Sequence, residues 1–246
     1  LCLPVAASAD QLAALQPVVF QSLCVTRPEG VLLIDAPLYA DDPGATPLPN
    51  YTPPPPIEEQ LWAAGVAPES ITHLVITHAH GDHFNGLTRQ MDGEDRPLYP
   101  NAVHYLGRGD WEMIQPQLAD PESMQSRTLG AVARAGLLRL VDAEMEILPG
   151  IRIIPAPGES PGHQIIRIET DDGILYHVGD LYHHEVEVVR PEWACHWAEA
   201  SAHNASRATF LSKALGEDAL ILASHIAGFG RIEQTAAGLR WSGNLF

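Results

Sequence analysis

Four side chains of the kind that bind metal ions occur within six positions, in the segment His78–His83 (His-Ala-His-Gly-Asp-His). His78 and His80 are two residues apart, so at the end of a strand both imidazoles can face the same side and bind one ion. The intervening glycine permits a sharp change of chain direction, which would let Asp82 and His83 face a second ion nearby. Burying all four side chains without partners would be costly, so we interpret the segment as a metal site.

This segment resembles the signature His-x-His-x-Asp-His of the metallo-β-lactamase superfamily and matches it residue for residue. The resemblance extends over about Val18 to Ile232 and implies three further ligands in the second half of the chain. The matching residues are His163 in Ser-Pro-Gly-His, Asp180 in His-Val-Gly-Asp and His225 in Ala-Ser-His.

The same resemblance implies two metal ions, with Asp180 as the ligand that bridges them. Zinc is the leading candidate, and iron, manganese and cobalt are alternatives because a set of histidines and carboxylates accepts each of them. The remaining ligands would be His78, His80 and His163 for one ion, and Asp82, His83 and His225 for the other.

Differences among the members of the superfamily reduce the number of candidate functions for this chain. Class B β-lactamases lack a bridging aspartate, so Asp180 disfavours antibiotic hydrolysis. Flavodiiron proteins have glutamate where this chain has His80, which disfavours an oxygen-reducing iron site. Glyoxalase II enzymes share all seven ligands but usually have a longer helical region at the C-terminus, for which little chain remains after His225.

Three later segments are similar to the lactonase and organophosphate-hydrolase branch of the superfamily: Gly179–His184, Arg190–Trp193 and Ser224–Arg231. The chain departs from that branch at two positions. Glu159 replaces the first histidine of the motif Gly-His-Thr-Pro-Gly-His. Tyr182 lies two residues after the bridging aspartate, whereas homoserine lactonases have a substrate-contacting tyrosine three residues after it.

The expected chemistry is hydrolysis by hydroxide held between the two ions. Two bound ions lower the pKa of a shared water from about 15.7 to roughly 7, which makes hydroxide available at neutral pH. Asp82 and Asp180 are the candidate catalytic residues, and Asp82 would shuttle the proton. We therefore expect a metal-dependent hydrolase that cleaves a lactone or another activated ester. A glyoxalase II-like thioesterase, a phosphotriesterase and a metal-binding scaffold without activity are the alternatives.

Apolar patterns place the ligands at the ends of strands. A hairpin is expected over 18–26 and 31–35, a helix over 57–64, and a β-branched strand over 73–77, directly before the histidine cluster. After a loop-rich middle, strands are expected at 151–155, 164–170, 174–178 and 219–223, with a helix at 204–215.

The resemblance implies an α/β fold, the four-layer αβ/βα sandwich of the superfamily. It would form a single domain over 1–246, with two pseudo-repeated halves that meet near 145–150. Residues 36–56 are rich in Pro, Asp and Gly and are expected to form a surface loop, either a spacer or a lid over the substrate.

Composition and charge exclude several classes of partner. The net charge of −17 repels phosphodiester backbones, so we expect a small-molecule substrate and no nucleic acid. No apolar run approaches the roughly 20 residues that cross a bilayer. The three cysteines are odd in number and widely separated, which favours reduced thiols. A cytoplasmic location is the default expectation. Residue 1 is not Met, so the start could be trimmed, and we leave a homodimer open.

Other histidines are less specific. His73, His104 and His177 fall in or beside expected strands, and we interpret them as structural because seven ligands already fill two sites. His183 and His184 are either surface residues or groups that orient a ligand or contact substrate.

Two further positions have polar side chains next to candidate elements. Asp35 ends the expected strand 31–35, where superfamily members often have an aspartate that supports the metal site. Cys195 and His196 are neighbours in sequence, and neighbours seldom face each other as a nucleophile and base, so we interpret them as structural.

Overall fold

The computed structural model describes residues 19–37 and 55–243. Residues 38–54, most of the predicted loop or lid, lie outside the described residues. The chain divides into two compact units. Of the described residues, the N-terminal unit comprises 22–37, 55–106 and 111–140, and the C-terminal unit comprises 19–21, 107–110 and 141–243. The predicted single-domain organisation over 1–246 stays a prediction.

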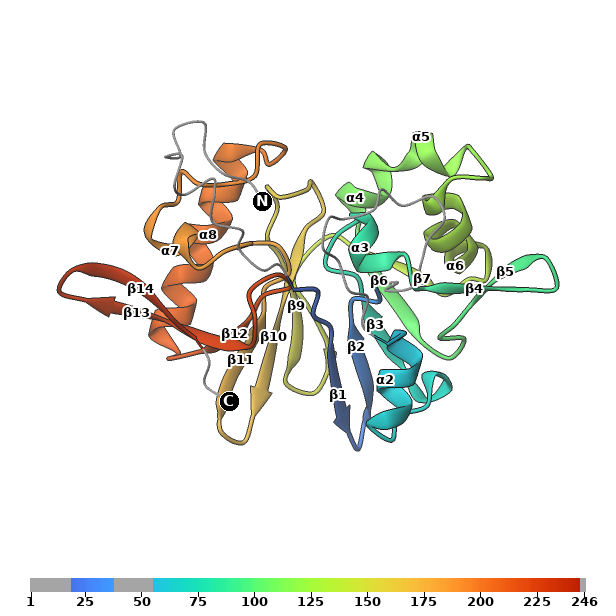
Figure 1. The fold of residues 1–246 in the computed structure, drawn as a ribbon, viewed down its shortest axis with the longest axis horizontal. Coiled ribbons are helices and arrows are strands. Elements are labelled where there is room, and N and C mark those ends of the chain that lie inside the picture. The colour runs from blue at the N-terminus through green and yellow to red at the C-terminus, as the bar shows by residue number, and fades with distance from the viewer. Residues whose placement is uncertain (1–18, 38–54, 244–246) are drawn as a thin grey trace. The chain divides into compact units, whose positions relative to one another are not determined.

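A five-stranded sheet in the order β1-β2-β3-β6-β7 forms the centre of the N-terminal unit (Figure 1). The predicted hairpin is confirmed, because Leu23 pairs with Ile34 and Arg27 pairs with Gly30 in an antiparallel register. The next pairings, β2 with β3 and β3 with β6, are parallel. The strands of this unit, with the separate β4–β5 hairpin, are β1 (Leu23–Arg27), β2 (Gly30–Ile34), β3 (His73–Val75), β4 (Thr88–Met91), β5 (Glu94–Pro97), β6 (Val103–Gly107) and β7 (Leu138–Val141).

The predicted helix over 57–64 is also present. Its apolar residues Ile57 and Leu61 are buried, and Gly65 follows it with φ +76, a left-handed conformation that glycine adopts without strain. The helical segments in this part of the chain are α2 (Ile57–Ala63), the 3-10 turn η1 (Pro68–Ser70), α3 (Gly81–Phe84), α4 (Arg108–Met113), α5 (Gln115–Leu118), the π-helical turn η2 (Ser126–Gly130) and α6 (Ala131–Arg134).

The prediction of a loop-rich middle was wrong. Helices α4 to α6 and the β4–β5 hairpin lie in this stretch. Each of these elements is short, and β5 consists of Glu, Asp, Arg and Pro, of which the first and third residues are exposed. A segment without an apolar face gives no hydrophobic periodicity from which it could be predicted.

The C-terminal unit contains a seven-stranded sheet in the order β14-β13-β12-β11-β10-β9-β8. The strands predicted at 151–155 and 164–170 are confirmed with the same bounds, and the strand predicted at 174–178 begins and ends one residue earlier. Figure 1 shows the β13–β14 hairpin, which had not been predicted, extending beyond the other strands. The strands are β8 (Met145–Leu148), β9 (Ile151–Pro155), β10 (Gln164–Thr170), β11 (Gly173–His177), β12 (Leu220–Leu222), β13 (Phe229–Thr235) and β14 (Gly238–Gly243).

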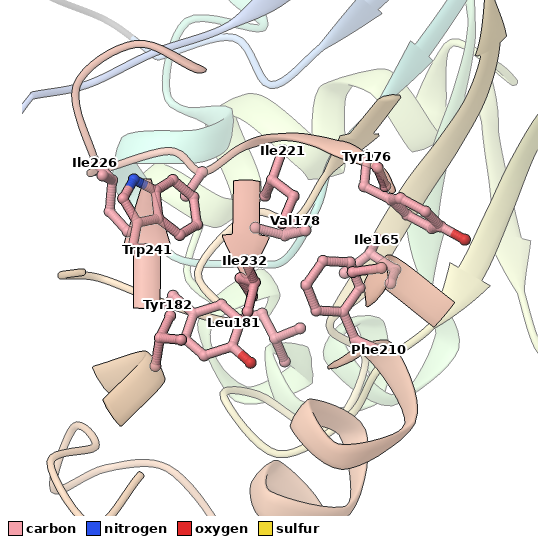
Figure 2. Close-up of a cluster of buried hydrophobic side chains, with 14 of the residues drawn as sticks. Ile165, Tyr176, Val178, Leu181, Tyr182, Phe210, Ile221, Ile226, Ile232 and Trp241 are labelled. Carbon is pink, nitrogen blue, oxygen red and sulfur yellow. The ribbon is translucent and has the colours of Figure 1, made fainter. Parts of the chain in front are cut away.

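Helix α8 (Ala200–Gly216) packs on this sheet, and the short helix α7 (Val186–Val189) precedes it. Figure 2 shows Phe210 of α8 among side chains of the sheet, with its ring 5.3 Å from that of Tyr176 and nearly perpendicular to it. A buried Phe side chain contributes about 1.5–3 kcal/mol to stability. Helix α8 begins four residues before the predicted Asn204, because the carboxylate of Glu199 accepts hydrogen bonds from the first backbone N–H groups.

Two simpler expectations concern membranes and cysteines. Across 19–37 and 55–243, none of the helices combines the length and apolar character that crossing a bilayer requires. Cys24 is half-buried and Cys195 is buried, both as reduced thiols, and Cys2 lies outside the described residues.

Candidate metal centre

The histidine cluster begins just beyond the end of β3 in the N-terminal unit. His78 is fully buried, and its Nε2 lies 3.0 Å from Nδ1 of His80. The rings of His78 and His83 are 4.0 Å apart between centroids. Three imidazoles therefore converge within one short segment, as the sequence pattern requires for metal binding.

The turn into α3 provides the carboxylate of this cluster. Gly81 is the first residue of α3, so Asp82 and His83 lie in its first turn. Oδ2 of Asp82 is 3.7 Å from Nε2 of His83, and the Asp82 side chain is 39% exposed. Asp82 can therefore both contact an ion shared with His83 and exchange protons with solvent.

Asp35 supports this cluster from the neighbouring strand end. Its Oδ1 accepts a hydrogen bond from Thr77 N at 2.7 Å, and its Oδ2 lies 2.8 Å from both the Thr77 hydroxyl and Nδ1 of His83. Asp35 adopts φ +59, a left-handed conformation that costs free energy in a non-glycine residue. The Nδ1 contact fixes the ring with Nε2 toward Asp82, an arrangement that carboxylates commonly impose on metal-binding histidines.

The C-terminal unit brings the remaining candidate ligands together around Asp180. Asp180 follows β11 after Gly179, which has φ +52. Its Oδ2 lies 3.2 Å from Nε2 of His225 and 3.0 Å from Nε2 of His183. Nδ1 of His225 is 2.8 Å from the carbonyl of Val19, which fixes that ring with Nε2 toward Asp180.

His163 approaches Asp180 from the turn between β9 and β10. Its Nδ1 is 3.0 Å from the carbonyl of Ala156, and its Nε2 accepts a hydrogen bond from Asp180 N at 3.2 Å. Burial lowers the pKa of His163, against the opposing effect of nearby carboxylates, so the ring is neutral. A neutral imidazole with a fixed Nδ1 proton presents Nε2 as a ligand atom.

Comparison with known proteins identifies the family. The sequence profile of the metallo-β-lactamase superfamily matches residues 21–225. This chain belongs to the metallo-β-lactamase superfamily. The match includes residues of both units, and it confirms the resemblance read from the sequence.

Individual relatives extend this result. An N-acyl homoserine lactonase of Bacillus cereus is 26% identical over 111 residues, which are 45% of this chain and 38% of the relative. The chain thus matches less than half the length of this curated relative. Among solved structures, AidC, a dizinc quorum-quenching lactonase, has a TM-score of 0.74 at 22% identity and covers 93% of this chain and 80% of its own. The hydrolase AbOPH has a TM-score of 0.71 at 20% identity, with the same coverage. The predicted α/β fold of the metallo-β-lactamase type is confirmed.

Asp110 is a supporting residue of this superfamily member that sequence reasoning missed. It is fully buried, and its carboxylate accepts hydrogen bonds from Ser160 Oγ at 2.9 Å and from Gly162 N at 2.6 Å. The backbones approach so closely that a Cβ on Gly162 would lie 2.4 Å from Asp110 N. Asp110 therefore fixes the turn that precedes His163. The two segments lie 50 residues apart in sequence, so no spacing signal could have found this contact.

A buried ion pair supports the Asp180 turn. Arg207 of α8 pairs with Glu187 of α7, and its Nε donates to the carbonyl of Leu181 at 2.8 Å. Oε1 of Glu187 accepts a hydrogen bond from His183 N at 3.2 Å. Because Leu181 and His183 lie one and three residues after Asp180, the pair fixes the backbone directly after this carboxylate.

His183 is the residue whose role the sequence left most open. Its Nε2 contacts Asp180, and Nδ1 is 3.4 Å from Cys195 Sγ. Burial alone would lower the pKa of His183, but Asp180 and Glu187 outweigh that effect and raise it to about 9. Tyr182 points instead into the core, beneath the guanidinium of Arg207 at 4.8 Å. The imidazole of His183, and not the Tyr182 phenol, faces the Asp180 carboxylate.

The other histidines lie where the sequence placed them. His73 begins β3, His104 lies within β6 and His177 ends β11. Nδ1 of His104 is 3.0 Å from the carbonyl of Ala102. His184 accepts a hydrogen bond from Val186 N at 3.1 Å on its Nδ1, which stabilises the start of α7.

The donor chemistry of each unit fits divalent metal ions. The N-terminal unit has three imidazoles and a carboxylate in one segment, and the C-terminal unit has Asp180 with two imidazoles on one of its oxygens. Neutral imidazoles held by carbonyls or carboxylates, together with carboxylate oxygens, are the ligand types that zinc, iron and manganese accept.

Proposed function

We propose that this chain is a dinuclear metal-dependent hydrolase that cleaves a lactone or another activated ester. The observation that carries the proposal is that all seven ligand positions of the superfamily are filled, and that buried carbonyl or carboxylate partners orient the histidines in both units. In this proposal Asp180 binds both ions. The other ligands are His78, His80 and His163 for one ion and Asp82, His83 and His225 for the other.

The proposed ions are zinc, on the basis of the ligand types and of AidC, whose structure is described as dizinc. When bound, such ions would lower the pKa of a water molecule to roughly 7 and polarise the electrophilic oxygen of a substrate. The protein's own residues have separate tasks. Asp35 holds Nδ1 of His83, the Ala156 carbonyl holds Nδ1 of His163, and the Val19 carbonyl holds Nδ1 of His225. Each contact occupies Nδ1 and fixes the ring so that Nε2 is the nitrogen that would bind an ion.

Asp82 is the proposed proton carrier. Its side chain is 39% exposed, whereas that of Asp180 is 4% exposed. A carboxylate in contact with solvent can accept a proton during attack and release it afterwards, while a buried carboxylate serves better as a fixed ligand. Asp82→Asn should therefore decrease kcat by a larger factor than it changes KM.

The presence of lactonases among the relatives supports a lactone as the proposed substrate. The matched curated relatives are N-acyl homoserine lactonases, and AidC is a quorum-quenching lactonase. The acidic chain, with a net charge of −17, is less suited to polyanionic substrates than to a neutral cyclic ester.

A substrate panel tests this function. Purified protein loaded with zinc, and Asp180→Ala as control, would be assayed on N-acyl homoserine lactones, aryl esters, a glutathione thioester, a phosphotriester and a phosphodiester. We expect turnover of lactones or esters that the substitution reduces at least about a hundredfold. Preferential turnover of the thioester or the phosphotriester would show that the protein is a thioesterase or a phosphotriesterase and not a lactonase. If protein that contains two ions turns over none of these substrates, the proposed hydrolase activity is refuted.

A further inference from the structure

Glu159 is a buried carboxylate beside the C-terminal half of the metal centre. It precedes His163 by four residues and is 2% exposed. One of its carboxylate oxygens lies within 4.8 Å of a carboxylate oxygen of Asp180. In the sequence, Glu159 stands out only as a departure from the motif Gly-His-Thr-Pro-Gly-His.

A hydrogen bond from Trp197 fixes the direction of this carboxylate. The indole Nε1 of Trp197 donates to Oε1 of Glu159 at 2.8 Å. A carboxylate has two oxygens and several lone pairs, so an oxygen that accepts from an indole leaves the group able to bind an ion as well. The ring of Trp197 also contacts that of His183, 6.1 Å away between centroids and nearly perpendicular.

Two buried carboxylates this close need positive charge. Like charges a few ångströms apart in a buried site disfavour ionisation of both groups unless a cation lies between or beside them. Arg207, a buried guanidinium of this unit, is engaged with Glu187 and with the carbonyl of Leu181. Nε2 of His183 lies 3.0 Å from Oδ2 of Asp180. Carboxylate oxygens of Glu159 and Asp180 that lie within 4.8 Å of each other are close enough to bind one cation between them.

We propose that Glu159 is an eighth ligand of the metal centre and binds the ion shared by His163 and Asp180. This inference rests on the proposed dinuclear function and concerns which ions that centre prefers. Carboxylate oxygen is a harder ligand than imidazole nitrogen, and harder ligand sets favour manganese and iron over zinc. Glu159 thus raises the affinity of the centre for Mn²⁺ relative to Zn²⁺.

The test compares metal affinities of the whole chain with those of two variants. Glu159→Gln keeps an oxygen that can accept from the Trp197 indole but removes the charge and the carboxylate ligand. Trp197→Phe keeps the carboxylate and removes only the group that orients it. Metal-free protein would be titrated with Mn²⁺ and separately with Zn²⁺ in competition with a chromophoric chelator, and circular dichroism would check that each variant is folded.

We expect Glu159→Gln to lower the affinity for Mn²⁺ by at least about tenfold more than the affinity for Zn²⁺. Trp197→Phe should give a smaller change in the same direction. Loss of a ligand should also change the visible absorption of Co²⁺-loaded protein, a readout independent of activity.

The outcomes separate this inference from the proposed function. If Glu159→Gln binds two ions with an unchanged ratio of Mn²⁺ to Zn²⁺ affinity and an unchanged Co²⁺ spectrum, Glu159 is no ligand while the dinuclear centre stands. If the wild-type chain itself binds fewer than two ions, the dinuclear function fails, and the ligand role fails with it. If Glu159→Gln does not fold, Trp197→Phe decides. An unchanged ratio of Mn²⁺ to Zn²⁺ affinity and an unchanged Co²⁺ spectrum in Trp197→Phe would overturn the proposal, and the expected small decrease in relative Mn²⁺ affinity would support it.

Discussion

Replacing Arg207 by Met should destabilise the C-terminal unit strongly. The guanidinium is 5% exposed and the Glu187 carboxylate that it pairs with is 4% exposed, so neither charge is compensated by solvent. Met fills a similar volume but leaves the Glu187 charge buried without its cation, a change that costs about 3–5 kcal/mol. The hydrogen bonds to the carbonyls of Leu181 and Pro191 are lost as well. Since domains are stable by about 5–15 kcal/mol, we expect a large decrease in the free energy of unfolding.

A double-mutant cycle in urea isolates the contribution of the pair. Arg207→Met, Glu187→Gln and the double variant would be unfolded in metal-free form and followed by circular dichroism. Removing the charge of Glu187 in the double variant should restore part of the lost stability. The losses of unfolding free energy in the two single variants should therefore sum to at least about 1 kcal/mol more than the loss in the double variant. Effects that add to within about 0.5 kcal/mol, or a loss below about 1 kcal/mol for Arg207→Met, would refute the reasoning.

Three further predictions follow from individual contacts. Asp35→Asn should weaken metal binding by about 10–100-fold, because the charged acceptor that orients Nδ1 of His83 is lost. Competition with a chelator measures the metal affinity, and an unchanged affinity would show that this contact is dispensable. Burial lowers the pKa of His104 to about 4, below about 6.5 in the unfolded chain, so this group's contribution to stability is complete above pH 6.5 and is lost as the pH falls toward 4. His104→Asn should remove up to about 1.4 kcal/mol per pH unit of that dependence in metal-free protein, and identical urea midpoints at pH 7 and 5 in the wild type would contradict this. Gly158→Ala should cost more than about 1 kcal/mol in thermal unfolding, because φ is +133 and a Cβ would lie 2.2 Å from His203 N; a wild-type melting temperature would contradict the clash.

Periodicity and residue type were sufficient to predict the strands that are buried in a regular sheet. The strands at 151–155 and 164–170 alternate or concentrate β-branched residues between turn signals, and their bounds agree with the structure. Exposed elements gave no such signal. The β4–β5 hairpin has mostly polar residues, and the start of α8 depends on Glu199, which is not among the preferred N-cap residues.

The candidate ligands could be found from the sequence because their residue types and local motifs are distinctive. The groups that support them could not. Asp110 acts on a turn 50 residues away, and Arg207 acts on a carboxylate 20 residues away, through contacts that no local spacing encodes. His183 and Tyr182 are adjacent in sequence and differ only in the direction of their side chains, which depends on packing against α8.

Metal content measured by mass spectrometry tests the central proposal most directly. Wild-type protein, purified with zinc and freed of loosely bound ions, should contain two equivalents per chain. Asp180→Ala removes the proposed bridging ligand and leaves the other six superfamily ligand positions intact. It should contain about one equivalent or less while retaining the wild-type circular dichroism spectrum. A wild-type chain with one equivalent or none, or an Asp180→Ala variant that still holds two with unchanged affinity, would contradict a dinuclear centre bridged by Asp180.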